Sequence, residues 1–189
     1  TGNGYGYGHY GKCGPYPCYT TPLGAGDIIS LAVVDTDLIA MAAERNILTG
    51  SLESDGAIKT LAVTGGTLVE GHVAGQSVSM EARKNNQVDG DVTGIDSVYI
   101  KSGNSALIQG DIESDGGITT ISMANTKVGG SVEGASVVML AGGNNEVMGD
   151  VKADGPDGIV MTAGHDNKVG GSVLASDGDV AMTSICCGN

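Results

Sequence analysis

The residues best equipped for chemistry are four cysteines, and all of them stand near the ends of the chain. Cys13 and Cys18 lie in the segment "YGKCGPYPCYTTP", and Cys186 and Cys187 lie in the closing "TSICCGN". Thiols in this arrangement can form disulfides, but adjacent cysteines pair with each other only in a strained ring. We therefore expect Cys186 and Cys187 to seek other partners.

Carboxylates are the second candidate group, because an acidic or small polar residue recurs after regularly spaced glycines. Stacked about 5 Å apart, such carboxylates repel one another unless they are separated, hydrated or bridged by a cation such as calcium. The calcium-binding pattern Gly-Gly-x-Gly-x-Asp is absent, however, and acidic faces are commonly solvated surface. We expect no metal and no cofactor, with Asp91, Asp111 and Asp150 as the candidates should a cation bind.

Histidines give little indication of catalysis. His9, His72 and His165 stand in three different contexts, and none has a zinc-ligand spacing with the cysteines. Beyond the N-terminal segment the chain has a single aromatic residue, Tyr99, whereas carbohydrate-active β-helices use aromatic clefts. We expect that the protein is not an enzyme.

Charge and apolar content limit the kinds of partner that the protein is expected to bind. The 189 residues include 9 basic and 22 acidic side chains, for a net charge of -13. This balance argues against nucleic acid and anionic membranes, because binding phosphates requires a basic patch. No stretch approaches the ~20 apolar residues of a membrane span, so we expect no membrane insertion. A chain that begins at Thr1 fits an exported protein whose leader has been removed.

Residues 1–25 differ in composition from the rest and are expected to form an extended arm. Glycine alternates there with most of the tyrosines, and three of the four prolines follow. The segment is either a disordered leader or an arm that orders against a partner, since Tyr offers contact area and a hydroxyl. The tyrosines that would make these contacts are Tyr5, Tyr7, Tyr10, Tyr16 and Tyr19.

From residue 26 onward the chain repeats. A glycine, a small or polar residue and an aliphatic residue recur eight times at intervals of 19 to 24 residues, beginning at Gly26, Gly50, Gly71, Gly90, Gly110, Gly130, Gly149 and Gly171. In seven repeats an aliphatic residue also stands two positions before the glycine. We interpret this as an inward-facing Val-x-Gly-x-Val strand with the glycine at its centre, allowing the opposite wall to come close.

A second alternating segment follows each anchor glycine. The eight segments are Ile39-Ala40-Met41, Leu61-Ala62-Val63, Val78-Ser79-Met80, Val98-Tyr99-Ile100, Ile121-Ser122-Met123, Val137-Val138-Met139, Ile159-Val160-Met161 and Val180-Ala181-Met182. Alternation with period two indicates strands, and we expect the first and third residues of each segment to face inward, as in a Val-x-Met-x-Ala strand. A helix would lose roughly 1 kcal/mol at each glycine relative to Ala. The sequence therefore predicts an all-β parallel β-solenoid over residues 26–189, with about eight ~20-residue coils.

Asparagines recur two residues before the aliphatic residue that precedes the anchor glycine, at Asn46, Asn86, Asn145 and Asn167. Their amides either hydrogen-bond from coil to coil or serve as turn formers that tolerate a left-handed backbone.

The segments "DSVYIKSGNSALIQGDI" and "ASVVMLAGGNNEVMGDV" resemble curlin, the subunit of bacterial curli fibres. In that family a Ser-x5-Gln-x-Gly-x-Gly-Asn pattern forms two-stranded coils behind a Gly-rich arm. Here Ser97 leads to Gly103-Asn104, and Ser136 leads to Gly143-Asn144, while Ser102 and Ala141 stand where the family has inward glutamines. The aliphatic coils also resemble bactofilin, a cytoskeletal β-solenoid that polymerises end to end. Both resemblances imply a self-assembling subunit.

The expected function is therefore a structural subunit of an extracellular or cell-surface filament, such as that of a biofilm, with copies of itself as partners. Uncapped solenoid ends favour head-to-tail growth, and cysteines outside the repeat favour an oxidising compartment. The alternatives are an intracellular bactofilin-like scaffold and a monomeric adhesin or binding module. Because the ends of one solenoid lie too far apart for Cys18 to reach its own C-terminus, the cysteines either close a Cys13–Cys18 loop or link neighbouring subunits.

Overall fold

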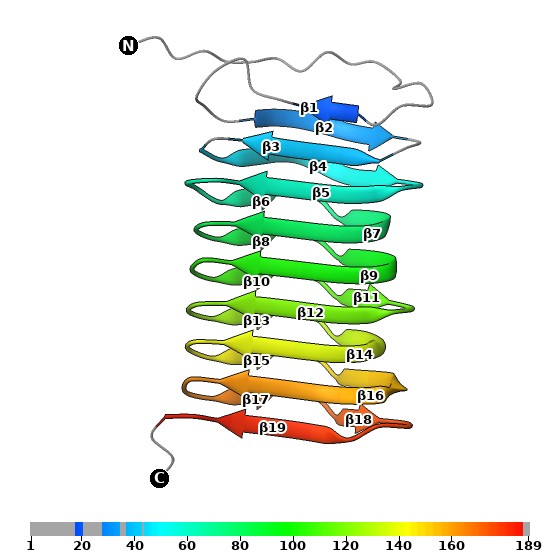
Figure 1. Ribbon diagram of the computed structural model, residues 1–189, viewed down its shortest axis with the longest axis vertical. Helices are drawn as coiled ribbons and strands as arrows, with labels where there is room; N and C mark the ends of the chain where they lie inside the picture. The colour runs from blue at the N-terminus through cyan, green and yellow to red at the C-terminus, as the bar shows by residue number, and fades with distance from the viewer. Residues whose placement is uncertain (1–17, 21–27, 35–36, 43, 187–189) are drawn as a thin grey trace.

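The computed structural model describes residues 18–20, 28–34, 37–42 and 44–186, and these form an all-β parallel β-solenoid (Figure 1). The described residues contain no helix. Successive coils stack along one axis, with β1 and β19 at opposite ends of the stack. The predicted fold class is confirmed.

Each coil has three strands. We call the three stacks of strands ladders A, B and C. Ladder A contains β1 (Cys18–Thr20), β3 (Leu38–Ala42), β5 (Ala57–Ala62), β12 (Gly117–Ser122), β19 (Val180–Ser184) and the second parts of β7 (Val73–Ala82), β9 (Val92–Ser102), β14 (Val132–Ala141) and β16 (Val151–Ala163). From β3 to β19 this ladder has eight rungs, so the coil makes about seven turns.

The other two ladders are shorter in each coil. Ladder B contains the first parts of β2 (Ile28–Val34) and β4 (Asn46–Ser54), then β6 (Thr67–Val69), β8 (Asn86–Val88), β10 (Ala106–Ile108), β13 (Thr126–Val128), β15 (Asn145–Val147) and β17 (Asn167–Val169). Ladder C contains the second parts of β2 and β4, the first parts of β7, β9, β14 and β16, and β11 (Ile112–Ser114) and β18 (Val173–Ala175). All of these pairings are parallel.

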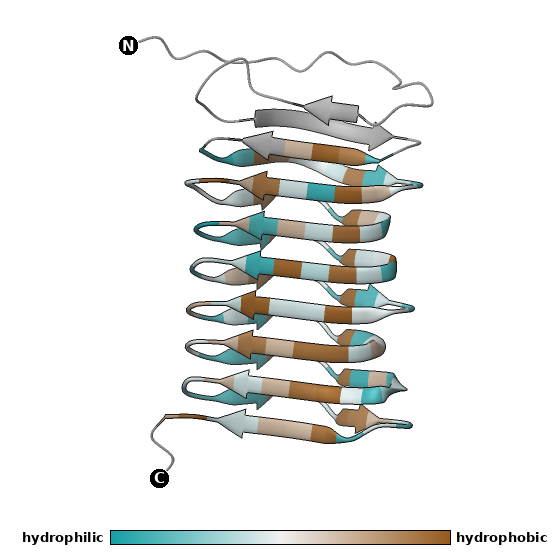
Figure 2. Ribbon diagram, viewed as in Figure 1, coloured by the Kyte–Doolittle hydropathy of each residue, from teal (hydrophilic) through white to brown (hydrophobic). Residues whose placement is uncertain are grey.

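The core is a narrow column of aliphatic side chains that alternate with outward-facing residues along each strand. Leu48, Val69, Val88, Ile108, Val128 and Val147 line ladder B at 1% exposure or less. The predicted aliphatic residue after each anchor glycine is equally buried from Leu52 to Val151. Apolar segments stack at the same place in successive front strands (Figure 2). The aliphatic positions predicted on both sides of the anchor glycine are therefore confirmed as core.

The predicted place of the anchor glycine is wrong in the six repeats from Gly71 to Gly171, whereas Gly50 lies within β4 as predicted. Val88 ends β8 and Val92 begins β9, so Gly90 lies at the corner between ladders B and C and not within one strand. A Cβ atom on Gly90 would lie 2.9 Å from the backbone nitrogen of His72 and 3.0 Å from the carbonyl carbon of Gly71 in the preceding coil. Glycine is therefore required by the close stacking of corners, not by the approach of the opposite wall.

The inward register of ladder A is also wrong in three coils, those of residues 39–41, 61–63 and 121–123. Pairing aligns Leu38 with Ile58 and Ile118 with Val137. Shifting a strand by one residue exchanges its two faces. Leu61 and Ile121 therefore face outward, whereas Leu38, Ala40, Ile58, Thr60, Ile118 and Thr120 are buried at 2% exposure or less.

The asparagine amides hydrogen-bond from coil to coil, which is the first of the two roles that the sequence left open. Asn145 Nδ2 donates to the Met139 carbonyl in its own turn at 3.2 Å, to the Thr162 carbonyl of the next coil at 2.9 Å and to Asn167 Oδ1 at 2.8 Å. Asn86 likewise donates to the carbonyls of its own turn and of the next coil. Each amide thus closes the turn from ladder A to ladder B and ties it to the following coil.

Candidate assembly interface

The C-terminal end of the solenoid exposes three unpaired strand edges. β17, β18 and β19 pair with β15 and β16 of the preceding coil, and no described strand pairs with their outer edges. Such an edge offers backbone N–H and C=O groups to any strand that approaches it. The end is therefore chemically competent to extend the sheet.

Side chains that occupy core positions are exposed to solvent at this end. Val180 and Met182 are 45% and 42% exposed, whereas Ile159 and Met161, which occupy the same register positions one coil earlier, are fully buried. Beyond β19, Ile185 is 74% exposed. The cross-section of the hydrophobic core is thus open to its surroundings at the C-terminal end.

The opposite end differs, because β1 adds a rung to ladder A. Cys18 pairs with Leu38 in parallel register, and the side chain of Leu38 is only 2% exposed. Among the described strands, ladder A therefore has nine rungs, whereas ladders B and C have eight, with β2 as their first. β1 falls within residues 1–25, which the sequence assigns to the arm.

The predicted cysteine and tyrosine contacts lie mostly outside the described residues. This applies to Cys13, Cys187, Tyr5, Tyr7, Tyr10 and Tyr16. Cys18 and Tyr19 are residues of β1, at the N-terminal end. Cys186 is exposed and follows β19, and its backbone N–H donates to the Gly164 carbonyl at 2.8 Å. Cys18 and Cys186 therefore lie at opposite ends of the solenoid. This agrees with the prediction that Cys18 is too far from the C-terminus of its own chain to reach it.

The three candidate cation ligands, Asp91, Asp111 and Asp150, all accept hydrogen bonds from the backbone of the following coil. The N–H of Asp111 is bound by Asp91 Oδ1 at 2.9 Å, and Asp111 Oδ1 in turn accepts from the N–H of Ser131 at 2.6 Å. Asp150 Oδ1 continues this series by accepting from the N–H of Ser172 at 2.7 Å. We call this series of side chains at the corner between ladders B and C the corner ladder. Its carboxylates satisfy backbone donors from coil to coil.

The corner ladder includes a contact that the sequence interpretation missed. Ser51 Oγ lies 2.8 Å from His72 Nδ1, and His72 Nε2 lies 2.9 Å from Glu53 Oε1. A carboxylate only accepts hydrogen bonds, so a neutral His72 carries its proton on Nε2 and accepts from Ser51. The spacing of 21 residues between Ser51 and His72, one coil, was the available signal.

A hydroxyl, an imidazole and a carboxylate in series are also the elements of a base-activated nucleophile. Here, however, the contact from Ser51 to His72 joins successive members of the corner ladder, as the Asp111 contacts do. We therefore assign it to coil stacking.

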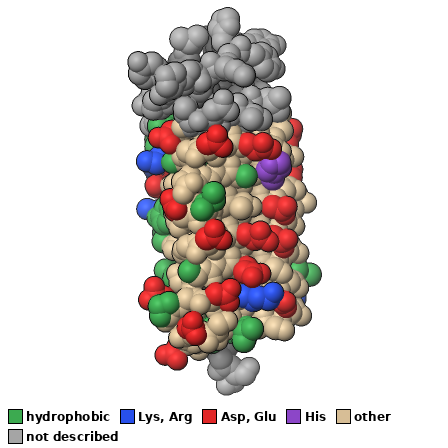
Figure 3. All heavy atoms as spheres, turned by 90° about the vertical axis from the view of Figure 1, so that its right-hand side faces the viewer, with side chains coloured by type: hydrophobic (Ala, Val, Ile, Leu, Met, Phe, Trp, Pro, Cys, Tyr) green, Lys and Arg blue, Asp and Glu red, His purple; other side chains and the backbone are tan. Residues whose placement is uncertain are grey.

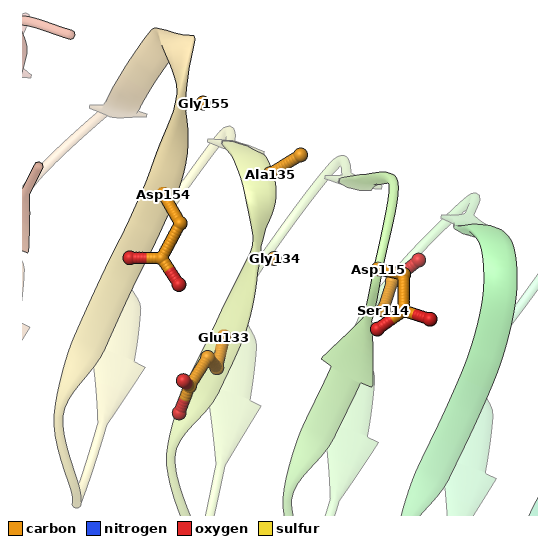
Figure 4. Close-up of a pocket in the computed structure, with 7 residues that line it drawn as sticks. All are labelled: Ser114, Asp115, Glu133, Gly134, Ala135, Asp154 and Gly155. Carbon is orange, nitrogen blue, oxygen red and sulfur yellow. The ribbon is translucent and has the colours of Figure 1, made fainter. Parts of the chain in front are cut away.

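The surface seen on turning the molecule by 90° carries many acidic side chains (Figure 3). A hollow of about 350 Å³ lies at the corner between ladders C and A (Figure 4) and is lined by Ser114, Asp115, Glu133, Gly134, Ala135, Asp154 and Gly155. Lys152 lies 3.6 Å from Glu133, and Ser176 donates to Asp154 at 3.0 Å. These contacts engage two of its three carboxylates.

Two negative findings concern the described part of the chain. No three His, Cys, Asp or Glu side chains in it are grouped so that they could hold a metal ion. It also contains no helix that is long and apolar enough to cross a membrane.

Comparison with known proteins found no match among family models, curated proteins or solved structures. The likeness to curlin and bactofilin thus rests on a shared architecture, a parallel β-solenoid with coils of about 20 residues. The three strands in each coil differ from the two-stranded coil of curlin.

Proposed function

We propose that this protein is the structural subunit of an extracellular filament in which copies stack head to tail through the ends of their solenoids. The observation that carries the proposal is the open C-terminal end, where Val180 and Met182 expose the core and three strand edges have no partner among the described residues. Two different ends that meet form a heterologous contact, which propagates into a fibre. The role is structural and not catalytic, and the partner is a second copy of the chain.

The number of rungs specifies how the ends would join. Simple stacking would leave ladder A with nine rungs in each subunit against eight in ladders B and C. If β19 of one subunit takes the place of β1 on β3 of the next, each ladder contributes eight rungs and all three continue across the junction. Val180 would then occupy the register position of Cys18, opposite Leu38.

Displacement of β1 would release the arm at the junction, where it can dock on the neighbouring subunit. Cys186 of that neighbour is exposed beside β19, so we propose a disulfide between Cys13 or Cys18 of the arm and Cys186 or Cys187 of the next molecule. A disulfide requires an oxidising compartment, which is consistent with an extracellular location.

The proposal is tested by placing a charge at the open end. We expect Met182→Lys to prevent filament formation, because polymerisation would bury the new ammonium group in the core without a partner. Met123→Lys is the matched control, since Met123 is 77% exposed at a turn in the middle of the solenoid. Negative-stain imaging and sedimentation should show filaments for the control and single subunits for Met182→Lys. Filaments of normal length from Met182→Lys would refute the proposed junction.

A further inference from the structure

Ladder A carries an outward face that is free of charge over its last four rungs. In β12, β14, β16 and β19 the outward residues form two columns, which are Thr119, Val138, Val160 and Ala181 in one and Ile121, Leu140, Thr162 and Thr183 in the other. We call these eight residues the neutral face. In the preceding rungs the same columns contain Lys59, Glu81 and Lys101, and hydrophilic segments interrupt the front strands there (Figure 2).

We infer that the neutral face pairs with the neutral face of a second copy, so that filaments associate side by side; this rests on the proposed function. Copies with a net charge of -13 repel one another, and contact costs least where neither surface is charged. Flat sheets with β-branched side chains pack face to face at a separation of about 10 Å. The neutral face provides such a surface for a self-complementary contact.

The size of the neutral face determines when this pairing occurs. Four rungs about 4.8 Å apart and six residues of about 3.3 Å each cover roughly 380 Å². A stable pair of proteins buries about 800 Å² on each partner, so two isolated subunits remain apart. A filament presents the face once in every subunit, and the repeated contacts add through their high effective concentration.

Charge at the two borders of the neutral face specifies the orientation of the pair. The corner where the strands of this face begin has five exposed aspartates: Asp115, Asp154, Asp157, Asp177 and Asp179. The corner where they end has one, Asp166, which follows His165; the other residues there are Asn, Gly, Ala, Met, Ile and Cys. A two-fold axis parallel to the solenoid axis sets each acidic corner against the nearly neutral corner of the other copy.

A two-fold axis parallel to the strands would instead bring the two acidic corners together, which is unfavourable. The preferred axis leaves both solenoids pointing in the same direction. Paired filaments should therefore have parallel polarity.

The test compares the wild-type protein with Val160→Glu and with a matched control, Leu68→Glu, by cryo-electron microscopy of assembled protein. Val160 is the most exposed aliphatic residue in the middle of the neutral face, at 36%. Leu68 faces outward on ladder B, between Ile47 and Gln87. We expect paired parallel filaments from the wild type and the control, and unpaired filaments from Val160→Glu. Filament formation by that variant shows that it folds.

Three outcomes overturn the inference alone, because filaments are present in each. These are unpaired filaments from the wild type, paired filaments from Val160→Glu, and pairs of opposite polarity. If none of the three proteins forms filaments, the proposed function fails, and the inference fails with it.

Discussion

Two buried threonines show how the solenoid tolerates polar atoms in its core. Thr60 and Thr120 occupy inward positions of ladder A at 2% and 0% exposure, and neither hydroxyl has a hydrogen-bond partner among the described residues. An unpaired hydroxyl in an apolar environment costs about 1–3 kcal/mol. The stack of neighbouring coils therefore imposes the register even where a threonine must face inward.

Thr120→Val is expected to stabilise the protein by about 1 kcal/mol, because valine has nearly the same shape and lacks the unpaired hydroxyl. Thr119→Val, on the outward face of the same strand, should change the free energy of unfolding far less. Chemical denaturation of both variants provides the measurement. A lower stability for Thr120→Val would indicate that the hydroxyl has a partner in solution.

Glu146 is the residue for which the structure predicts a pH dependence. Hydrogen bonding from Lys168, and then from Lys127, lowers the pKa of the Glu146 carboxyl below its ordinary value. The lysine ammonium groups lie 3.2 and 3.4 Å from its two carboxylate oxygens. A lowered pKa in the folded state means that the charged carboxylate stabilises the fold above the pKa of the unfolded chain. This contribution is lost as the pH falls through the folded pKa.

Titration of the Glu146 carboxyl by NMR should therefore give a pKa below the ordinary value of about 4.3. High salt should move the pKa back toward that value, because the pairs are exposed to solvent. A pKa at or above the ordinary value in low salt would show that the two lysines do not engage Glu146.

At the scale of the elements, the corner ladder adds side-chain hydrogen bonds between successive coils where the strands are interrupted. Backbone bonds also cross each corner between ladders B and C, as from the Gly130 N–H to the Gly110 carbonyl at 3.0 Å. The N–H of the residue after the anchor glycine is instead accepted by a side-chain oxygen of the preceding coil, as Asp111 accepts from Ser131. Glycine beside each acceptor leaves room for this contact.

Asp111→Ala is expected to lower the free energy of unfolding by about 1–2 kcal/mol, because the N–H of Ser131 loses its acceptor in a half-buried corner. Glu113→Ala is a suitable control, since Glu113 is an exposed outward residue two positions further along the same coil. Thermal unfolding of the two variants should separate them clearly. Equal stabilities would mean that the corner ladder contributes nothing beyond backbone stacking.

Prediction from the sequence succeeded where one residue type has one physical role. The spacing of the aliphatic residues around each anchor glycine predicted the inward columns, because only apolar side chains fill a narrow core. It failed at Gly90, because a residue in a strand and a residue at a corner give the same alternation when the flanking aliphatics both face inward. It also failed at Leu61 and Ile121, where the strand offers aliphatic residues on both faces and only pairing with neighbouring coils decides between them.

The assembly edge was predictable in part. The sequence predicted an uncapped end after Met182, and the exposed Val180 and Met182 agree with that prediction. The additional rung formed by β1 was not predictable, because "CYT" carries no anchor glycine and lies among prolines and glycines. The neutral face was also missed, since its residues come from four coils and become neighbours only through the ladder.

At the scale of the whole molecule, the two ends of the solenoid are different, and this difference gives the assembly a direction. The C-terminal end exposes core side chains and strand edges, whereas β3 at the other end is already paired with β1. Each junction of the proposed filament, the first as well as every later one, requires the displacement of one β1.

A helical reconstruction of the assembled protein tests the central claim most directly. The account predicts that ladders A, B and C continue across each junction and that the subunits repeat every eight rungs of about 4.8 Å, an axial rise of about 38 Å. A rise of nine rungs, about 43 Å, would retain the filament but contradict the displacement of β1. Single subunits, or closed pairs joined end to end by a two-fold axis, would contradict head-to-tail assembly itself.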